Sequence, residues 1–436
     1  MSVTPLTLRI PPHRYFVPLR WHHRLLWRIA SVLRRAYPLR VEGAERLPRT
    51  GPAVVIAPHM SFSDSFLFLY PALPRPARLL SSVFFMQSSA LVSWLMYLSG
   101  VLPLTKCVSD IRAARRMLRL LAGGEVVALF PEGERSWTGV SLDPVAASAK
   151  FLARLKVPVF IAEIEGAYDH WPRWGQAPRW RPVTVRLQGP IALPVPAPAH
   201  SRSSPQRKWW NPVYHSGGHL DAAAARTALA TLLRERSRKE AARLDLLDAD
   251  RFRQVPRLIC YCPECARPQP LVDGRRLACP DCGASWLPVP GGALRREGDG
   301  KQEEPWLLSD LFARMLETLR GNVHSLLPLE VPVSVTVMNG TGGTASSGRV
   351  RLDRNGALVT AAGSRWEIDL AAVALGEVSG ASLLEVHARC GTLLALESNP
   401  SALHLVLPAR ALLGLPWGGQ ASAPPLASRD AGETHA

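Results

Sequence analysis

Short apolar runs alternate with helical patterns along much of the first half of the chain, and this alternation constrains the fold more than any other sequence feature. Apolar runs at 53–57, 126–130 and 157–164 predict strands, and the patterns at 110–122 and 144–155 predict helices between them. Strands that alternate with helices favour a mainly parallel sheet with helices on both faces. We therefore predict an α/β fold for this part of the chain.

The 436-residue chain is too long for one ordinary core, and changes in composition divide it into segments. Short alternating strands in the last third predict a small β domain, with LHLVL at 403–407 as its final strand. The expected segments are a basic amphipathic N-terminal segment (1–48), an α/β domain (49–217), a charged helical connector (218–255), a cysteine-rich module (256–290), a helix plus small β domain (305–416) and a disordered tail (417–436).

The N-terminal segment is strongly basic, with eight arginines and no acidic residue between Arg9 and Arg40. Together with the formal net charge of +17, this indicates an anionic partner such as a membrane surface, a phosphorylated substrate or a nucleic acid. Residues 21–37 form an amphipathic helical pattern with arginines opposite the apolar face, which suits a bilayer interface. The alternative is a helix that packs on the next domain. We expect an anionic membrane surface as a partner, and we find no clear indication of a nucleic-acid partner.

Residues 83–104 form an uncharged run of 22 residues, which is long enough for a transmembrane helix. Polar residues such as Gln87 and Ser93 interrupt it, so a buried or membrane-dipping helix is favoured and a true span stays open. The first 20 residues lack the apolar core of a signal peptide. We therefore expect a peripheral or monotopic protein on the cytoplasmic face of the cell membrane.

His59 and Asp64 lie in the segment PHMSFSD, directly after the first predicted strand. Open α/β sheets place their functional groups at the carboxyl ends of strands, which is where His59 falls. A carboxylate five residues on can bind one imidazole nitrogen, fix the tautomer and leave the other nitrogen as a base. One His and one Asp at this spacing also arise by chance, so the pair alone identifies no activity.

A second polar segment, FPEGERS at 130–136, follows the predicted strand at 126–130. Gly133 permits a tight turn in which the backbone can approach a ligand. Arg135 carries a planar set of donors that suits phosphate, and Glu132 could orient Arg135 or receive a hydroxyl group. Taken alone, such a cluster is also typical of a solvated loop.

Together, HMSFSD and FPEGERS resemble the two signature motifs of the glycerolipid acyltransferase superfamily, and in particular of the 1-acyl-sn-glycerol-3-phosphate (lysophosphatidic acid) acyltransferases. The spacing of 73 positions from His59 to Glu132 fits that family. GVLPLTK, which ends at Lys106, and VPVFIAEIEGA, which begins at Val157, resemble two further motifs of the family. The resemblance covers roughly residues 20–190 and implies a glycerol-phosphate acyltransferase-like α/β fold.

The resemblance also implies a role for each matching residue. His59 would remove the proton of the acceptor hydroxyl, Asp64 would orient His59, and the acceptor would attack the thioester of acyl-CoA or acyl-carrier protein. Pro58 and Lys106 depart from the residues that the family usually has, which leaves the acceptor less certain than the reaction. The substrate-binding residues implied by the resemblance are Lys106, Glu132, Gly133, Arg135 and Ser136.

Two C-x2-C pairs, separated by 13 residues, predict a tetrahedral zinc site within a zinc ribbon over 256–290. A closed set of four thiolates indicates a structural Zn²⁺ rather than a catalytic one. Cys260 is a spare cysteine that could replace Cys262, although its spacing is poorer. The predicted ligands are Cys262, Cys265, Cys279 and Cys282.

These observations favour an enzyme: a membrane-associated O-acyltransferase of phospholipid biosynthesis that acylates lysophosphatidate or a related lysophospholipid. Another acceptor, such as glycerol 3-phosphate, is an alternative within the same class. The alternative hypothesis is a lipid-sensing or regulatory protein with an acyltransferase-like domain. Such a protein would recruit a protein partner through its zinc ribbon. The four residues His59, Asp64, Glu132 and Arg135 favour the enzyme, since a domain without activity has no chemical reason to keep all of them.

Overall fold

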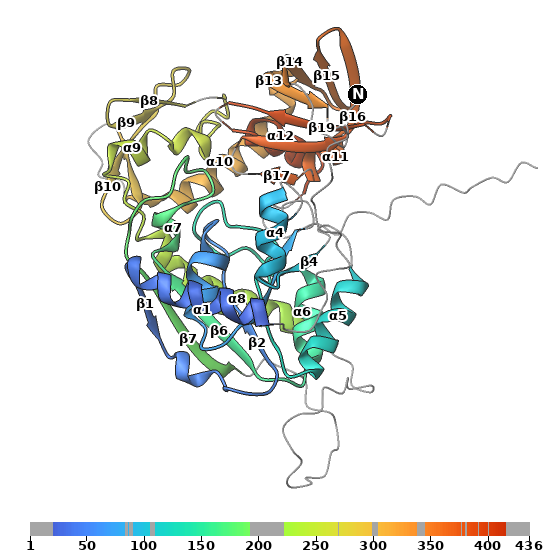
Figure 1. Cartoon of the computed structure of the whole chain (residues 1–436). Coiled ribbons are helices and arrows are strands. Elements are labelled where there is room, and N and C mark those ends of the chain that lie inside the picture. The colour runs from blue at the N-terminus through green and yellow to red at the C-terminus, as the bar shows by residue number, and fades with distance from the viewer. Residues whose placement is uncertain are drawn as a thin grey trace, which may run out of the picture.

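A computed structural model describes the chain at residues 21–82, 86, 90–104, 110–191, 222–268, 270–298, 304–337, 345–375, 377–379, 382–390, 392–399 and 401–415. Three sheets with surrounding helices follow one another along these residues (Figure 1). The predicted tail at 417–436, the first 20 residues and Lys106 lie outside the described residues.

The first sheet has seven strands in the order β1-β7-β6-β2-β5-β3-β4. Neighbouring strands run parallel, except that β6 and β7 run antiparallel. The predicted mainly parallel α/β sheet is therefore confirmed, with β1 and β7 as an added edge. The strands are β1 (Leu39–Glu42), β2 (Ala53–Ile56), β3 (Ala77–Ser82), β4 (Leu102–Leu104), β5 (Val126–Leu129), β6 (Val159–Glu165) and β7 (Val183–Ile191).

Helices cover both faces of this sheet, as predicted. Side chains alternate along a strand, so Val55 of β2 lies in one hydrophobic core with Phe68, whereas Val54 lies in a second core with Met117 and Leu152. The first face carries α1 (Trp21–Leu33), the π-helical turn η4 (Asp64–Leu69), α2 (Tyr70–Ala72) and α4 (Ala90–Leu98). The second face carries α5 (Ile111–Ala122), α6 (Ala146–Arg154) and α8 (Ala222–Ala241).

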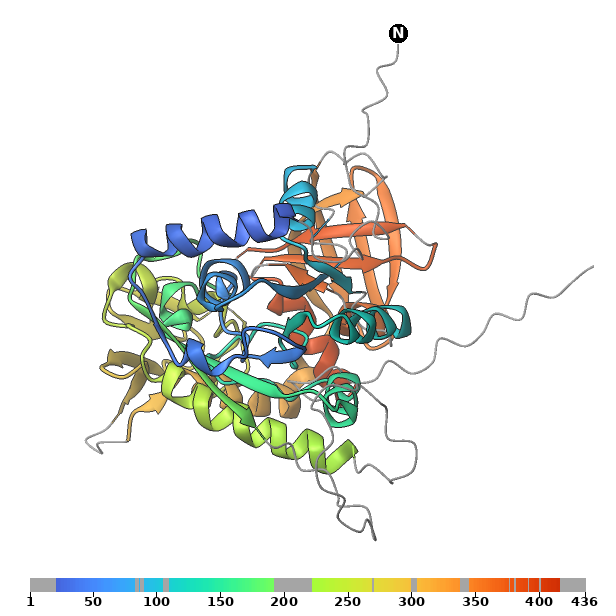
Figure 2. The same cartoon turned by 60° about the horizontal axis from the view of Figure 1, so that its bottom comes forward.

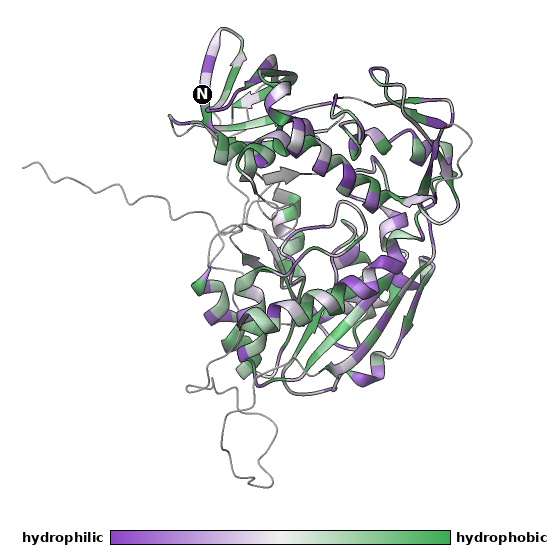
Figure 3. Cartoon of the chain, turned by 180° about the vertical axis from the view of Figure 1, so that it is seen from behind, coloured by the Kyte–Doolittle hydropathy of each residue, from purple (hydrophilic) through white to green (hydrophobic). Residues whose placement is uncertain are grey.

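Local sequence explains where these helices begin and end. The side chain of Asp110 caps α5 by accepting a hydrogen bond from the backbone N–H of Ala113 at 2.8 Å, and Gly123 follows its last turn. Helix α8 is striped with hydrophilic and hydrophobic residues (Figure 3) and packs against α6. Its apolar stripe, with Leu229 and Leu233, belongs to the second core, so this helix is part of the α/β layer.

No helix within the described part of the chain is long and apolar enough to cross a membrane. Helix α4 contains nine residues of the uncharged run at 83–104, and several other residues of that run lie outside the described ranges.

Two antiparallel sheets follow the α/β layer, in the orders β12-β11-β10-β9-β8 and β16-β15-β14-β13-β19-β18-β17. The first sheet begins in the predicted cysteine-rich module and continues through β11 and β12, beyond the predicted end of that module at residue 290, and the second sheet lies in the predicted small β domain. Their strands are β8 (Leu271–Asp273), β9 (Arg276–Ala278), β10 (Ser285–Val289), β11 (Ala293–Glu297), β12 (Trp306–Leu307), β13 (Leu329–Val337), β14 (Ala345–Leu352), β15 (Gly356–Ala361), β16 (Ser364–Asp369), β17 (Glu377–Ser379), β18 (Leu383–His387) and β19 (Leu393–Glu397).

The segment LHLVL at 403–407 forms the first half of a helix, so the prediction of a strand there is wrong. All five of its residues are buried, and a run that is buried on every side shows neither the strand nor the helix period. The remaining helices are α7 (Ala167–His170), α9 (Ala249–Phe252), α10 (Leu308–Asn322), α11 (Leu370–Leu375) and α12 (Leu403–Leu412).

One continuous hydrophobic core joins all three parts of the chain. It contains Trp174 of the α/β part, Tyr261 beside the cysteines and Leu405 of α12. The Tyr261 hydroxyl donates a hydrogen bond to the backbone carbonyl of His404 at 2.7 Å, and Asp169 Oδ1 accepts one from the backbone N–H of Asp245 at 3.1 Å. The cysteine-rich and C-terminal parts are therefore packed on the α/β part (Figure 2).

Candidate active site and cysteine cluster

Asp64 holds both the His59 imidazole and the loop that carries it. The chain leaves β2 at Ile56, and η4 begins at Asp64. Asp64 Oδ2 lies 2.9 Å from His59 Nδ1 and accepts hydrogen bonds from the backbone N–H groups of Met60 and Ser61 at 2.6 and 2.7 Å. The Asp64 side chain is fully buried, whereas that of His59 is 19% exposed. The arrangement fixes the imidazole at the carboxyl edge of the sheet, as the sequence predicts.

Glu132 joins the second motif to the first through the backbone of His59. Its Oε2 accepts a hydrogen bond from the His59 backbone N–H at 2.7 Å, and its Oε1 accepts one from the Ser141 hydroxyl. The backbone N–H of Ser136 donates to the His59 carbonyl at 2.8 Å, and the Phe130 ring stacks on the imidazole at 4.1 Å. Burial raises the pKa of Glu132 to about 8. Residues 73 positions apart thus fix the position of His59 from both sides.

Gly133 and Ser136 shape the turn between these contacts. Gly133 has a φ of 70°, which favours glycine, and a Cβ atom there would lie 3.0 Å from a methyl group of Val145. Ser136 is buried, and its hydroxyl donates a hydrogen bond to the Val140 carbonyl at 2.6 Å. The side chain of Ser136 therefore stabilises the loop itself.

Arg135 places a cation beside the His59 loop. Its guanidinium lies 5.3 Å from the centre of the Phe62 ring, and no described residue accepts a hydrogen bond from it. Burial, and then the neighbouring Arg173, lower the pKa of Arg135 to about 10, although the negative charges of Asp64 and Glu134 act in the opposite direction. Arg173 is held separately, because its Nη1 donates to Glu134 Oε1 at 2.7 Å and to the Arg135 carbonyl at 3.1 Å. Such a guanidinium suits an anionic ligand.

A buried histidine that the sequence analysis did not single out supports the same loop. His170 Nε2 lies 3.0 Å from Ser63 Oγ, and its Nδ1 lies 2.8 Å from the Tyr37 hydroxyl. The Arg179 carbonyl, which can only accept, lies 2.6 Å from His170 Nδ1, so Nδ1 carries the proton and Nε2 accepts from the Ser63 hydroxyl. The sequence separations of 107 and 133 residues leave no local signal that could have revealed these contacts.

Helix α8 braces the loop that contains Ser141. The Ser237 hydroxyl oxygen accepts a hydrogen bond from the Ser141 backbone N–H at 2.7 Å. Glu240 accepts another at 2.7 Å from the backbone N–H of Gly166, where β6 ends. Because Ser141 also donates to Glu132, α8 is connected to His59 through two side chains.

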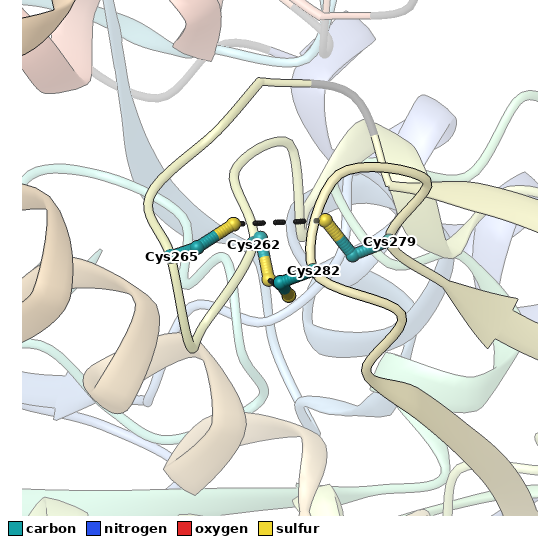
Figure 4. A group of neighbouring side chains, drawn as sticks. All are labelled: Cys262, Cys265, Cys279 and Cys282. Atoms are coloured by element: carbon teal, nitrogen blue, oxygen red, sulfur yellow. Dashed lines mark hydrogen bonds between the residues drawn. The ribbon is translucent and has the colours of Figure 1, made fainter.

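The four predicted cysteines form one cluster (Figure 4). Their Sγ atoms all lie within 4.8 Å of one another, with Cys262 3.6 Å from Cys282 and Cys265 3.7 Å from Cys279. A tetrahedron of Zn–S bonds of about 2.3 Å has sulfur–sulfur edges of about 3.8 Å, so the cluster fits a metal ion of that size. Cys260 is buried outside this group, which favours Cys262 as the ligand.

Both C-x2-C turns have the same backbone geometry. The N–H of Cys262 donates to the Arg267 carbonyl at 2.8 Å, and the N–H of Cys279 donates equivalently to Ala284 at 2.8 Å. The residue after the second cysteine of each turn has a positive φ, 60° at Ala266 and 74° at Gly283. Two matched turns that present four sulfurs form a zinc-ribbon-like cluster.

Comparisons with known proteins define the class of the α/β part. Residues 38–162 match the family model described as Acyltransferase, so this part of the chain is an acyltransferase-family domain. The match contains His59, Asp64, Glu132 and Arg135 and ends before His170 and α8.

Two curated plant proteins and one solved structure are similar to parts of the chain. A chloroplastic 1-acyl-sn-glycerol-3-phosphate acyltransferase of Arabidopsis thaliana is 32% identical over 142 residues, which are 31% of this chain and 37% of that protein. One of Brassica napus is 30% identical over 148 residues, covering 32% of this chain and 41% of that protein. The chain thus spans about two fifths of the length of these curated relatives. The crystal structure of the 1-acyl-sn-glycerophosphate acyltransferase PlsC of Thermotoga maritima aligns with a TM-score of 0.35 at 19% identity, over 51% of this chain and 83% of that one.

Proposed function

We propose that the protein transfers a fatty acyl group from a thioester donor to the hydroxyl of lysophosphatidate or a related lysophospholipid. The observation that carries this proposal is the His59–Asp64 pair, fixed beside Arg135 at the carboxyl edge of the sheet. The match of the same residues to the Acyltransferase family and the names of the two plant relatives support it. The donor is acyl-CoA or acyl-carrier protein.

In the proposed mechanism, His59 is the general base. Since Nδ1 faces Asp64, Nε2 takes the proton from the acceptor hydroxyl, and the oxygen attacks the thioester carbonyl carbon. The carbon–sulfur bond then breaks, and the leaving thiolate receives the proton from Nε2. Asp64 keeps the tautomer and stabilises the imidazolium that forms between these steps.

Arg135 is the proposed ligand of the acceptor phosphate, because its guanidinium is desolvated and the carboxylates that attract it, Asp64 and Glu134, are held by His59 and Arg173. Lys106, which the sequence resemblance assigns to the same phosphate, lies outside the described residues. Glu132 and Ser136 are buried, so we assign them to positioning of the His59 loop rather than to direct contact with substrate.

We infer a membrane contact from the first face of the sheet. Helix α1 exposes apolar side chains along one side, and α4, whose Tyr97 ring stacks on His22 at 5.7 Å, exposes more. Arg24 and Arg28 are also exposed on α1, which suits anionic headgroups. The exposed apolar residues are Trp21, Leu25, Ile29, Val32, Leu33, Leu91, Trp94 and Leu95.

We also infer that the cysteine cluster holds a structural zinc ion, because four thiolates leave no open coordination position. The ion would join the two C-x2-C turns, and Tyr261, which directly precedes the first of them, contacts α12. Protein partners of this module stay a hypothesis.

An acceptor panel tests the proposed activity. The purified full chain is given a radiolabelled acyl donor with lysophosphatidate, other lysophospholipids or glycerol 3-phosphate. We expect the highest kcat/KM with lysophosphatidate and a loss of about 100- to 10,000-fold in a folded His59→Ala variant. A folded variant with near-wild-type transfer would refute the role of His59.

Vesicle binding tests the membrane contact. Leu25→Asp and Trp94→Asp should weaken binding to anionic vesicles, whereas Leu247→Asp should not, because Leu247 is similarly exposed but lies outside both helices. Equal binding by all three variants would indicate that α1 and α4 are not the contact.

A further inference from the structure

Helices α5 and α6 present a basic surface on the second face of the sheet. Six long basic side chains are exposed there, and the stretches 111–124 and 144–162 contain no Asp or Glu. Both helices pack in the second hydrophobic core and so cover the same face of the sheet. The α5–α6 basic surface consists of Arg112, Arg115 and Arg119 of α5, Lys150 and Arg154 of α6, and Lys156 directly after α6.

The six charges are not neutralised within the described part of the chain, because none of these side chains forms an ion pair with a described residue. The neighbouring helix α8 is different: its Arg234 pairs with Asp143, its Arg236 with Glu163. Unpaired like charges on one surface repel one another, so this surface favours an acidic partner.

The α5–α6 basic surface lies on the face of the sheet opposite to α1 and α4, so it does not face a bilayer that α1 and α4 contact. Met117 of α5 and Leu152 of α6 pack in the second core, whereas Met96 of α4 and Trp27 of α1 pack in the first. The sheet therefore separates the two surfaces. Ile111 is the one exposed large hydrophobic residue of α5 and α6 among the described residues, which also suits a soluble partner better than a bilayer.

The surface nevertheless begins close to the candidate active site. Helices that connect parallel strands run back antiparallel to them, so α5 and α6 both start at the carboxyl edge that carries His59. Arg112 lies in the first turn of α5, and Arg119 lies seven residues, or about 10 Å of helix, further from that edge. Basic side chains on two helices of the same face make a surface that a helix of a partner protein can contact.

We propose that the α5–α6 basic surface docks the carrier-protein form of the acyl donor, a small acidic protein that bears the acyl thioester on a flexible prosthetic arm. This inference rests on the proposed acyl transfer and selects between its two donors. The phosphates of coenzyme A could neutralise a few of the six charges, whereas an acidic protein helix can face both basic helices. Docking beside the edge that carries His59 brings the arm to the acceptor.

Charge reversal tests the surface on the full chain. The α5 variant is R112E/R115E/R119E, and the α6 variant K150E/R154E/K156E provides a second test if the first does not fold. R351E/R354E/R365E is the matched control, since it changes the same charge on three exposed arginines of the C-terminal β domain. The assays are the Kd for holo-acyl carrier protein, the KM for palmitoyl-acyl carrier protein and palmitoyl-CoA, and binding to anionic vesicles.

We expect either surface variant to raise the Kd and the KM for the carrier protein by about tenfold or more, with a smaller effect at high salt, because exposed charges are screened. In both surface variants, the KM for palmitoyl-CoA and the binding to vesicles should change less than about threefold. In the control variant, all of the measured quantities should change less than about threefold. Equal losses with both donors, or a loss of vesicle binding instead, would overturn the proposal.

The two proposals fail in distinguishable ways. If the wild type transfers from palmitoyl-CoA but neither binds nor uses the carrier protein, the docking surface is refuted and acyl transfer stands. If it binds the carrier protein through α5 and α6 but acylates no lysophospholipid, the docking surface stands and the proposed acceptor reaction is refuted.

Discussion

Replacement of Asp64 by Asn should separate the catalytic effect of the Asp64 charge from the structural effect of its hydrogen bonds. Asp64 Oδ2 accepts three hydrogen bonds, from His59 Nδ1 and the N–H groups of Met60 and Ser61, while Oδ1 is buried without a hydrogen-bond partner. An Asn side chain can place its oxygen where Oδ2 lies and its amide nitrogen where Oδ1 lies. All three hydrogen bonds then persist, and only the negative charge is lost.

The magnitudes follow from this geometry. One amide group buried without a partner costs about 1–3 kcal/mol, which leaves a typical domain folded. The imidazolium that forms during transfer loses its buried counter-charge, so kcat should fall by about 100-fold or more. The KM for the acceptor should change little, because Asp64 is fully buried and cannot contact the substrate.

Steady-state kinetics and thermal unfolding of the same preparations measure both effects. Asp169→Asn is the matched control, since Asp169 is another nearly buried carboxylate, whose partners are Arg179, Arg181 and the backbone N–H of Asp245 rather than His59. It should lower the melting temperature without a comparable fall in kcat. A folded Asp64→Asn protein with near-wild-type kcat would refute the proposed role of the carboxylate.

Three further predictions address other residues. Arg135→Ala should raise the KM for lysophosphatidate by about tenfold or more, since one charged contact contributes about 1.5–3 kcal/mol; an unchanged KM would exclude Arg135 from the phosphate site. The pKa of Glu132 is raised from 4.5 to about 8, so the folded protein retains a proton that the unfolded chain releases, and the stability contributed by Glu132 declines as the pH rises across that window. Glu132→Gln cannot ionise, so its melting temperature should fall less between pH 5 and 8 than that of the wild type, and a steeper fall would contradict the assignment. The wild type should carry about one zinc ion per chain, and Cys279→Ser should lose it; equal zinc contents by metal analysis would disprove the site.

The sequence predicted those parts of the fold that depend on short-range patterns. The strands and helices around His59 and Glu132 follow from local periodicity, and their positions at strand ends bring the two motifs to one edge of the sheet. The cysteine pairs were equally predictable, because their spacing alone encodes the matched turns.

Long-range contacts could not be predicted in this way. Ser237 contacts Ser141 across 96 positions, and nothing in a charged helical pattern distinguishes a connector from a helix that braces a catalytic loop. The burial of Glu132 was invisible for a similar reason, because it depends on Ser141 and on the His59 backbone. Residues 403–407 were assigned to a strand because complete burial removes the periodic signal.

The pairing of β1 with β7 has a consequence for synthesis on the ribosome. Leu39 pairs with Val183, so β1 must wait until 144 further residues have been added, which takes roughly 7–30 s at about 5–20 residues per second. Tyr37 waits as long for the carbonyl of Arg181. Helix α1 precedes Tyr37 and β1 in the sequence, so it leaves the ribosome before them. Its apolar side depends only on its own residues. During that interval α1 can meet a lipid surface before the edge of its own sheet exists, so the proposed membrane contact can precede folding of the α/β domain.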